Sequence, residues 1–478
     1  MPLTEPEAAA LIDRLSRELQ NRQSYIDRWD RYYRGEQPLA YASSEWRTFH
    51  ADRYKDHSDN WCGVVADSPA ERNVVAGIRL PLDGAGTLAA ETDDELWRVW
   101  QINEGDADSS AGFVDANVSS RVFVLVWGDS PVEVTWESPR EMIVAYEPGS
   151  RRKRTAALKM WREDDNTEYA TLYLPDEVWK FHRKTSVLDI HMPGVDLLKW
   201  RPRELALEPN PQPNPMGEVP VVELQNRPRL DGTCRSEIDG VAATQDAINL
   251  LWAYLFTTAD FASFPQRVVM GQSPPKVPVL NSDGEVIGEK VVPLEKFMQD
   301  RIVWLTGQNA SIGEWKAAAL NQFTDIVEVQ VGHLAAQTRT PQHYLVGKMA
   351  NLSAEALVAA ESGLVQKVRE QQLFYGPRIR EVFRLIALAK NDPAKAEAVA
   401  AGQVVWKDAE SRSEQQMADK IIKLRQAGFP FKWLIEEYGV SPTEVGRIME
   451  MKKAEIEEAS RADIAAMMGD PTGVPDDE

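Results

Sequence analysis

Residues 236–265, SEIDGVAATQDAINLLWAYLFTTADFASFP, decide how the rest of the chain is interpreted. From Ile238 to Phe256 the apolar side chains recur at helical spacing, which predicts one long helix from about residue 236 to 262. Pro265 ends it, because proline lacks a backbone N–H and its ring clashes with the preceding turn. The residues after Pro265 do not continue as a partner helix but as a proline-rich segment with strand-like runs.

That segment is predicted to form a small β module. Two β-branched runs, residues 277–280 and 286–292, flank a turn whose composition favours a β-hairpin. Residues 301–305 predict one more strand. The turn consists of Asn281, Ser282, Asp283 and Gly284.

Helical periodicity returns beyond the module. Residues 320–337 predict a second helix, a Thr-Pro pair at 340–341 interrupts it, and residues 353–390 predict a very long helix. A Gly-Pro pair at 376–377 should kink that helix. The order helix, β module, helix suits a subunit whose two helices present the module at a distance.

The N-terminal half mixes helices with antiparallel strands. Residues 4–34 predict a helix with a capping box between Thr4 and Glu7, and two shorter helical patterns follow it. Short β-branched and aromatic runs between residues 122 and 182 predict a mostly antiparallel sheet region, which the proline-rich linker 210–215 closes. The expected fold class is therefore α+β.

Composition excludes several classes of protein. The chain has 478 residues with a net charge of −20, whereas tight DNA binding needs a basic surface; an acidic chain can still surround DNA without holding it. Its two cysteines, Cys62 and Cys234, predict neither a disulfide framework nor a metal site. No signal-peptide pattern is present, and the longest apolar stretch, residues 247–256, is too short to cross a bilayer, so a soluble protein is expected.

Catalytic motifs are missing from the sequence. The nearest approach to a phosphate-binding loop is Gly347-Lys348, but Gln342 stands where the earlier glycine should be and Met349 where a Ser or Thr should bind magnesium. We therefore expect a protein that is not an enzyme and that holds no metal and no cofactor.

Five short stretches, taken in order, give the most specific signal. They are YYRGEQP at 32–38, NWCGVV at 60–65, RSEI at 235–238, TPQHYLVG at 340–347 and VWKD at 405–408. Together they resemble the bacteriophage portal family, in particular its gp6-like branch, over most of the chain. The resemblance implies a structural protein that forms a ring, typically a homododecamer, around a channel for viral DNA packaging and ejection.

The resemblance also implies a division of the chain into named parts. These are a wing at 1–235, a first stem helix at 236–263, a clip at 264–316, a second stem helix at 317–338, a tunnel loop at 339–356, a long kinked helix returning to the wing at 357–404, and a helical crown with a disordered C-terminal tail at 405–478.

Candidate site residues follow from this division. Asp325 and Glu328 of the second stem helix are candidates for the channel wall, where acidic side chains would repel DNA phosphates; solvated or intersubunit charges are the equal alternative. The hairpin turn at 281–284 is the candidate docking site in the clip. The candidate DNA-contacting residues of the tunnel loop, which offer one positive charge and several small or polar side chains, are Lys348, Met349, Ala350, Asn351, Leu352 and Ser353.

The implied partners are other copies of the chain and the machinery of a phage head. They include double-stranded DNA that passes non-specifically, the terminase motor, the major capsid or scaffolding protein, and a head–tail adaptor, with no membrane involved. The implied location is the portal vertex of the virion capsid, and the host cytoplasm during assembly.

Two alternatives stay open at this point. Residues 431–449 have the pattern of a helix-turn-helix, which would suit a DNA-binding regulator, although Thr443, Glu444 and Arg447 make a poor base-reading set. A non-viral structural scaffold is the other alternative, and the helix, module, helix order speaks against it.

Overall fold

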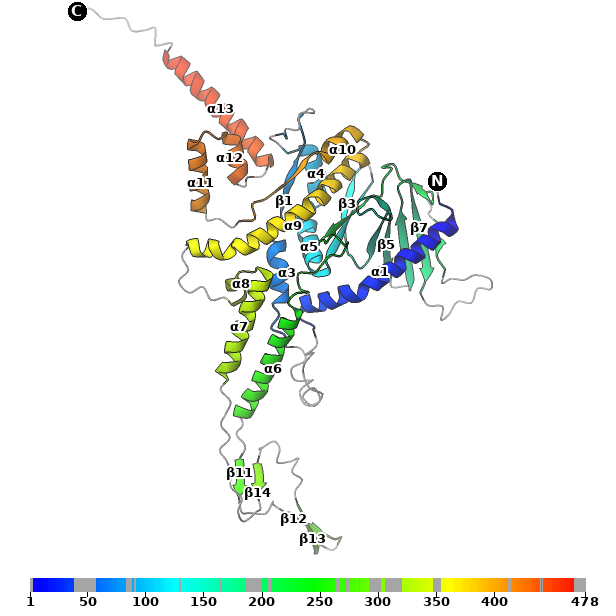
Figure 1. The fold of residues 1–478 in the computed structure, drawn as a ribbon, viewed down its shortest axis with the longest axis vertical. Helices are drawn as coiled ribbons and strands as arrows, with labels where there is room; N and C mark the ends of the chain where they lie inside the picture. Colours follow the sequence, from blue (N-terminus) through cyan, green and yellow to red (C-terminus); the bar gives the residue numbers. More distant parts are fainter. Residues whose placement is uncertain are drawn as a thin grey trace, which may run out of the picture. The chain divides into compact units, whose positions relative to one another are not determined.

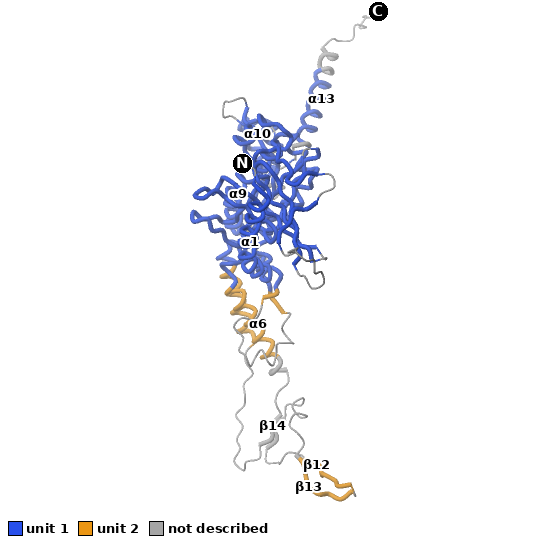
Figure 2. Tube along the Cα trace, turned by 90° about the vertical axis from the view of Figure 1, so that its right-hand side faces the viewer, with its two compact units in different colours: residues 1–35, 60–242, 335–478 blue, residues 36–59, 243–334 orange. Residues whose placement is uncertain are grey.

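The computed structural model describes residues 3–37, 57–82, 88–89, 92–128, 130–163, 166–185, 199–204, 208–263, 267–270, 276–282, 284–291, 302–305, 320–346, 354–410, 414–438, 440 and 442–467. The chain forms two compact units (Figure 2). Unit 1 comprises residues 1–35, 60–242 and 335–478, and unit 2 comprises residues 36–59 and 243–334.

The main core of unit 1 lies around a three-stranded antiparallel sheet. Five of the seven residues of its central strand, RVFVLVW, are buried, because helices pack against the sheet. Phe113 and Tyr375, which come from two of these helices, stack with ring centroids 5.2 Å apart. In spatial order the strands are β10 (Val221–Gln225), β2 (Arg121–Trp127) and β3 (Glu133–Glu137), and the helices are α5 (Gly105–Ser119) and α9 (Ala354–Ala389).

A larger antiparallel sheet of six strands forms the second layer of unit 1. One of its faces is covered by α1 (Glu5–Arg34) (Figure 1). Ile12 and Leu15 of this helix are fully buried in one cluster with apolar side chains such as Leu158 and Phe181. The strands are β4 (Met142–Tyr146), β5 (Arg154–Arg162), β6 (Thr167–Tyr173), β7 (Glu177–Lys184) and β8 (Arg201–Pro202), with β9 (Gln212–Pro213) paired to β7.

Unit 1 also joins distant parts of the chain. Strand β1 (Val75–Arg79) pairs antiparallel with β15 (Gln403–Trp406), so the segment after α9 returns to the N-terminal half. Short helices complete this side of the unit: α3 (Cys62–Ala70), α4 (Asp94–Ile102) and α10 (Pro393–Ala400). The C-terminal helices are α11 (Glu414–Gln426), α12 (Phe431–Tyr438) and α13 (Pro442–Met467).

Unit 2 has the nested order that the opening stretch predicted. Helix α6 (Ala242–Ser263) leads into β11 (Arg267–Met270), which pairs in parallel with β14 (Ile302–Leu305). Between these two strands the chain forms the hairpin of β12 (Lys276–Leu280) and β13 (Val286–Val291). Helix α7 (Asn321–Thr338) then leaves the unit.

Several predicted elements are confirmed. The capping box of α1 joins Thr4 and Glu7, with the Thr4 amide donating to the Glu7 carboxylate at 2.8 Å. The second and third long helices occupy 321–338 and 354–389, within one residue of their predicted ends. The third continues through Pro377 as a single helix.

Other predictions need correction. The helix predicted from about residue 236 begins at Ala242, because Ser236 accepts the Ile238 amide with its hydroxyl and the chain turns there instead. The sheet region does not close at the linker 210–215, since β10 follows it and pairs with β2. Helix α5 falls where no helix was predicted: its GDADSSAG sequence has little helical periodicity, and its burial depends on packing against the sheet.

Candidate functional site

The hairpin predicted from residues 277–280 and 286–292 is formed, and its turn has the expected geometry. Asn281 closes it with three contacts: its amide donates to the Glu285 carbonyl (3.0 Å), its carbonyl accepts from Gly284 (3.2 Å), and its side chain accepts from the Glu285 amide (2.8 Å). Gly284 has a φ of +83°, a conformation that glycine adopts without strain. Ser282 is exposed, whereas Asp283 lies outside the described residues.

The two strands of this hairpin are exposed to an unusual degree. They carry five large aliphatic side chains with exposed fractions between 38% and 67%. A two-stranded hairpin alone is at best marginally stable in water. An exposed group of apolar side chains on such a hairpin is typical of a surface that contacts a partner. They are Val277, Val279, Leu280, Val286 and Ile287.

The two predicted stem residues lie on one exposed stripe of α7. Asp325 and Glu328 are three residues apart, which places them on the same helix face, and both are exposed. Val327 and Val331 are buried on another face.

The predicted tunnel-loop residues 348–353 lie outside the described residues, but both flanking elements are described. Helix α8 (Gln342–Val346) precedes them and α9 follows them. Arg72 joins these two elements: one guanidinium nitrogen donates to the Tyr344 hydroxyl of α8 (2.7 Å) and to the Glu361 carboxylate of α9 (3.1 Å). Its other terminal nitrogen donates to the Ala409 carbonyl (2.9 Å). Arg72 therefore contacts both helices that flank the predicted loop.

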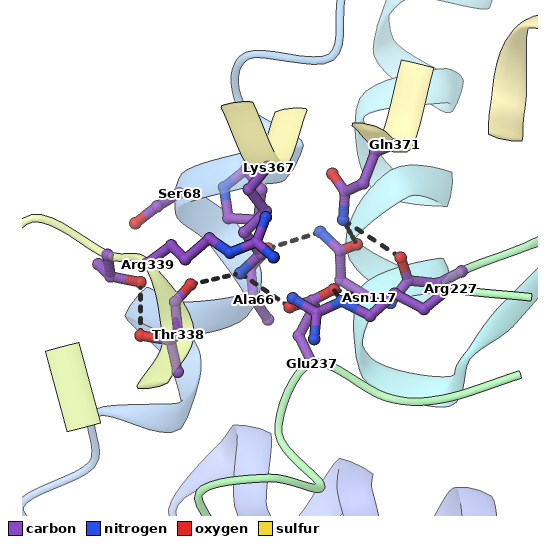
Figure 3. Close-up of polar contacts among 12 residues, drawn as sticks. Ala66, Ser68, Asn117, Arg227, Glu237, Thr338, Arg339, Lys367 and Gln371 are labelled. Atoms are coloured by element: carbon purple, nitrogen blue, oxygen red, sulfur yellow. Dashed lines mark hydrogen bonds and ion pairs between the residues drawn. The ribbon is translucent and has the colours of Figure 1, made fainter. Parts of the chain in front are cut away.

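A buried charge cluster connects several distant segments of unit 1 (Figure 3). The Lys367 ammonium of α9 lies 2.8 Å from the Glu237 carboxylate, and both side chains are only 1% exposed. Lys367 also donates to the carbonyl of Thr338, the last residue of α7 (3.2 Å). Glu237 has a second cation, Arg227, at 2.7 Å.

Buried amides surround this ion pair. The Asn226 side chain donates to Glu237 (3.0 Å) and accepts from Gln371 (3.2 Å). Gln371 also donates to Asn117 (2.8 Å), as Figure 3 shows. Asn117 in turn donates to the Ala66 carbonyl (2.8 Å). Since a buried polar group is costly unless it is hydrogen-bonded, this chain of contacts is what makes the buried charges tolerable.

The electrostatics of the pair are asymmetric. Burial raises the pKa of Glu237, but Lys367 and Arg227 outweigh this effect and leave that pKa below its ordinary value. Burial lowers the pKa of Lys367, and Glu237 offsets this only in part. The two pKa shifts differ because Glu237 has two cationic partners within the cluster, whereas Lys367 has one anionic partner.

Sequence reasoning did not assign this cluster. Glu237 stood in the RSEI stretch without a role, and Lys367 had the pattern of one more polar residue in a long helix. A signal exists in the helical register, because Lys367 falls on the same stripe as Leu364, Gln371 and Tyr375, all of which are buried.

The described part of the chain lacks the features of a metal site and of a membrane span. Within it, no group of three His, Cys, Asp or Glu side chains is placed to hold a metal ion. None of the helices described there combines the length and apolar character that a membrane span requires. A cavity of about 300 Å³ lies between α1 and the six-stranded sheet, but its Glu177 is already used structurally, accepting from the Leu3 amide and the Trp179 indole (both 2.9 Å).

Comparison with known proteins gives a consistent result. Residues 12–458 match the family model described as phage portal protein, SPP1 Gp6-like. The portal protein of Mycobacterium phage D29 is 29% identical over 76% of this chain and 71% of its own length. The portal protein of Mycobacterium phage L5 is 29% identical over 80% of this chain and 74% of its own length.

Two solved assemblies show a weaker likeness. A chain of the neck of a native GTA particle, computed with C12 symmetry, is 10% identical with a TM-score of 0.38 and covers 85% of this chain and 96% of its own. A chain of the neck of an empty GTA particle, computed with C6 symmetry, is 11% identical with a TM-score of 0.35. The match covers 82% of this chain and 92% of that one.

The family match spans nearly the whole chain. The α+β class predicted from sequence is confirmed, and the regulator and non-viral scaffold alternatives are set aside. The chain belongs to the SPP1 Gp6-like family of phage portal proteins, a structural family, and is a portal subunit of a phage head–tail connector.

Proposed function

We propose that twelve copies of the chain close into a ring at the portal vertex of the capsid, assembled in the host cytoplasm, and that DNA enters and leaves the head through its centre. Unlike subunits of a filament, subunits with a head-to-tail interface that closes on itself give cyclic symmetry. In this proposal the subunit is not an enzyme and holds no cofactor, and the energy for packaging comes from a separate motor.

The observation that supports the proposal most is the exposed hairpin of β12 and β13. Five exposed aliphatic side chains on a two-stranded hairpin need a covering surface. We infer that this hairpin is the clip, and that its turn at Asn281, Ser282 and Gly284 docks the head–tail adaptor. Other faces would meet the terminase and the major capsid or scaffolding protein.

We propose that the wall of the channel binds DNA only weakly. A chain with a net charge of −20 has no surplus of Lys and Arg to displace counterions from DNA, and Asp325 and Glu328 on α7 would add rings of negative charge. The loop residues 348–353, with the single charge of Lys348, would touch the phosphate backbone weakly and without reading sequence.

The test is assembly of the purified chain and of a variant that lacks residues 271–300. Light scattering coupled to size exclusion should give a mass near twelve subunits for the full chain, and electron micrographs should show rings with a central hole. The variant should keep the folded content of unit 1 and lose binding of the adaptor. A full-length chain that stays monomeric at all salt concentrations, with scaffolding protein present, contradicts the ring; adaptor binding by the shortened variant contradicts the clip assignment.

A further inference from the structure

We propose that Lys367 is a positioning residue of the portal subunit: its ammonium group fastens the end of α7 and the segment leading into α6 to the same point of α9. The inference concerns residues 236–242 and 335–340, all of which belong to unit 1. The structural part of the inference, that Lys367 holds both segments, is independent of the proposed channel. The functional part, that DNA packaging needs this contact, rests on the proposed function.

The end of α7 offers one carbonyl for this contact. Arg339 has a φ of +56°, and the helix closes with the Arg339 amide donating to Ala336 (3.4 Å) and the Thr340 amide donating to Ala335 (3.1 Å). This capping motif satisfies two terminal carbonyls. The Thr338 carbonyl accepts from Lys367 (3.2 Å), and a cation is favoured there by the helix dipole as well.

The segment before α6 is fixed from two sides. The Glu237 amide donates to the Asn117 carbonyl of α5 (2.8 Å), and the Ser236 hydroxyl donates to the same carbonyl (3.2 Å). The Glu237 carboxylate then reaches Lys367 (2.8 Å), as Figure 3 shows. One ammonium group therefore contacts two segments about a hundred residues apart in the sequence, on either side of the proposed stem helices and clip.

Stability alone does not explain a lysine at this position. Burial disfavours its charge, and Glu237 already has Arg227 as a partner, so an apolar side chain at 367 would leave no anion unpaired. What Lys367 adds is the contact with the Thr338 carbonyl. The role of Lys367 follows from that contact. A displacement of the end of α7 moves the Lys367 ammonium, which also holds Glu237 in the segment before α6.

Hydrogen exchange of the full-length chain tests the structural part. Lys367→Met should raise the exchange rates of amides in both 237–242 and 335–340 roughly tenfold or more, as expected from the loss of a charge-assisted hydrogen bond. Arg227→Met should loosen the first segment more than the second, because Arg227 contacts Glu237 directly and Lys367 still contacts the Thr338 carbonyl. Arg384→Met removes an ion network with Glu218 and Glu381 elsewhere in unit 1 and should change neither segment.

The three variants are compared at equal distances below their melting temperatures. Unchanged protection at 335–340 in Lys367→Met overturns the inference, as does a loosening of 335–340 in Arg227→Met as large as that in Lys367→Met. If Lys367→Met is too unstable, Lys367→Gln serves instead, with the same two segments as the readout. DNA packaging by heads assembled with Lys367→Met then tests the functional part: normal packaging despite loosened segments refutes the channel role alone, and failure of the wild type to form rings refutes the proposed function instead.

Discussion

At the residue scale, the Glu237 carboxylate is the group on which the buried cluster depends. Its pKa is lowered in the folded chain, so its contribution to stability is complete above the ordinary value of 4.5 and is lost as the pH falls through the lower folded-state value. Glu237→Gln leaves the buried Lys367 without an anion, and breaking such a pair costs about 3–5 kcal/mol. Lys367→Met should cost less, because Arg227 remains beside Glu237.

Chemical denaturation measured from pH 7 down to pH 3 checks this ordering. The difference in unfolding free energy between wild type and Glu237→Gln should be largest at neutral pH. It should start to shrink below about pH 4.5, where the unfolded chain takes up the proton, and vanish below the lower folded-state pKa, where the folded wild type loses the charge too. A difference that is constant over the whole range would mean that Glu237 acts through packing and not through its charge.

At the element scale, the hairpin of β12 and β13 should govern association and not folding of the subunit. Ile287→Ser should weaken assembly or adaptor binding by about 1.5–3 kcal/mol, the usual value of one buried aliphatic side chain, while the melting temperature stays unchanged. Ile102→Ser on α4 is the matched control, since both isoleucines are 67% exposed. Assembly and adaptor binding are measured by sedimentation. If both substitutions weaken them equally, the hairpin has no particular role in association.

Helix α7 gives a second prediction at this scale. Replacing Asp325 and Glu328 by lysine should make the rings retain DNA in a salt-dependent manner, because each added cation that contacts phosphate releases counterions. Glu455 and Glu458, also exposed and three residues apart on α13, provide the control pair. DNA retention is measured between about 50 and 200 mM salt for the two double-lysine variants. Identical retention by both variants would show that α7 does not face the duplex.

At the scale of the whole molecule, net charge sets how readily subunits approach one another. Subunits that each carry −20 repel one another, so ring formation should improve between low and physiological salt as the screening length falls to about 8 Å. Light scattering across a salt series measures this directly. Rings that dissociate as salt rises would instead indicate interfaces held by complementary ion pairs.

Local signals were enough for part of this structure. The capping box at Thr4 and Glu7, the hairpin turn after Leu280 and the periodicity of α7 and α9 act between neighbours in the chain, so the sequence predicts them directly. The order helix, β module, helix follows from these elements alone.

Only the tertiary structure decided the rest, because it depends on packing between distant residues. Helix α5 has weak periodicity of its own and is stabilised by the sheet beneath it, and β10 and β15 are strands because β2 and β1 are available to pair with them. The Lys367–Glu237 pair joins residues 130 positions apart, and a buried lysine is tolerable only where a folded chain brings an anion and a helix-end carbonyl to it. The sequence by itself determined the elements with strong local signals and their order, whereas long-range contacts, with their cost in chain entropy, determined α5, β10 and β15 and which elements meet.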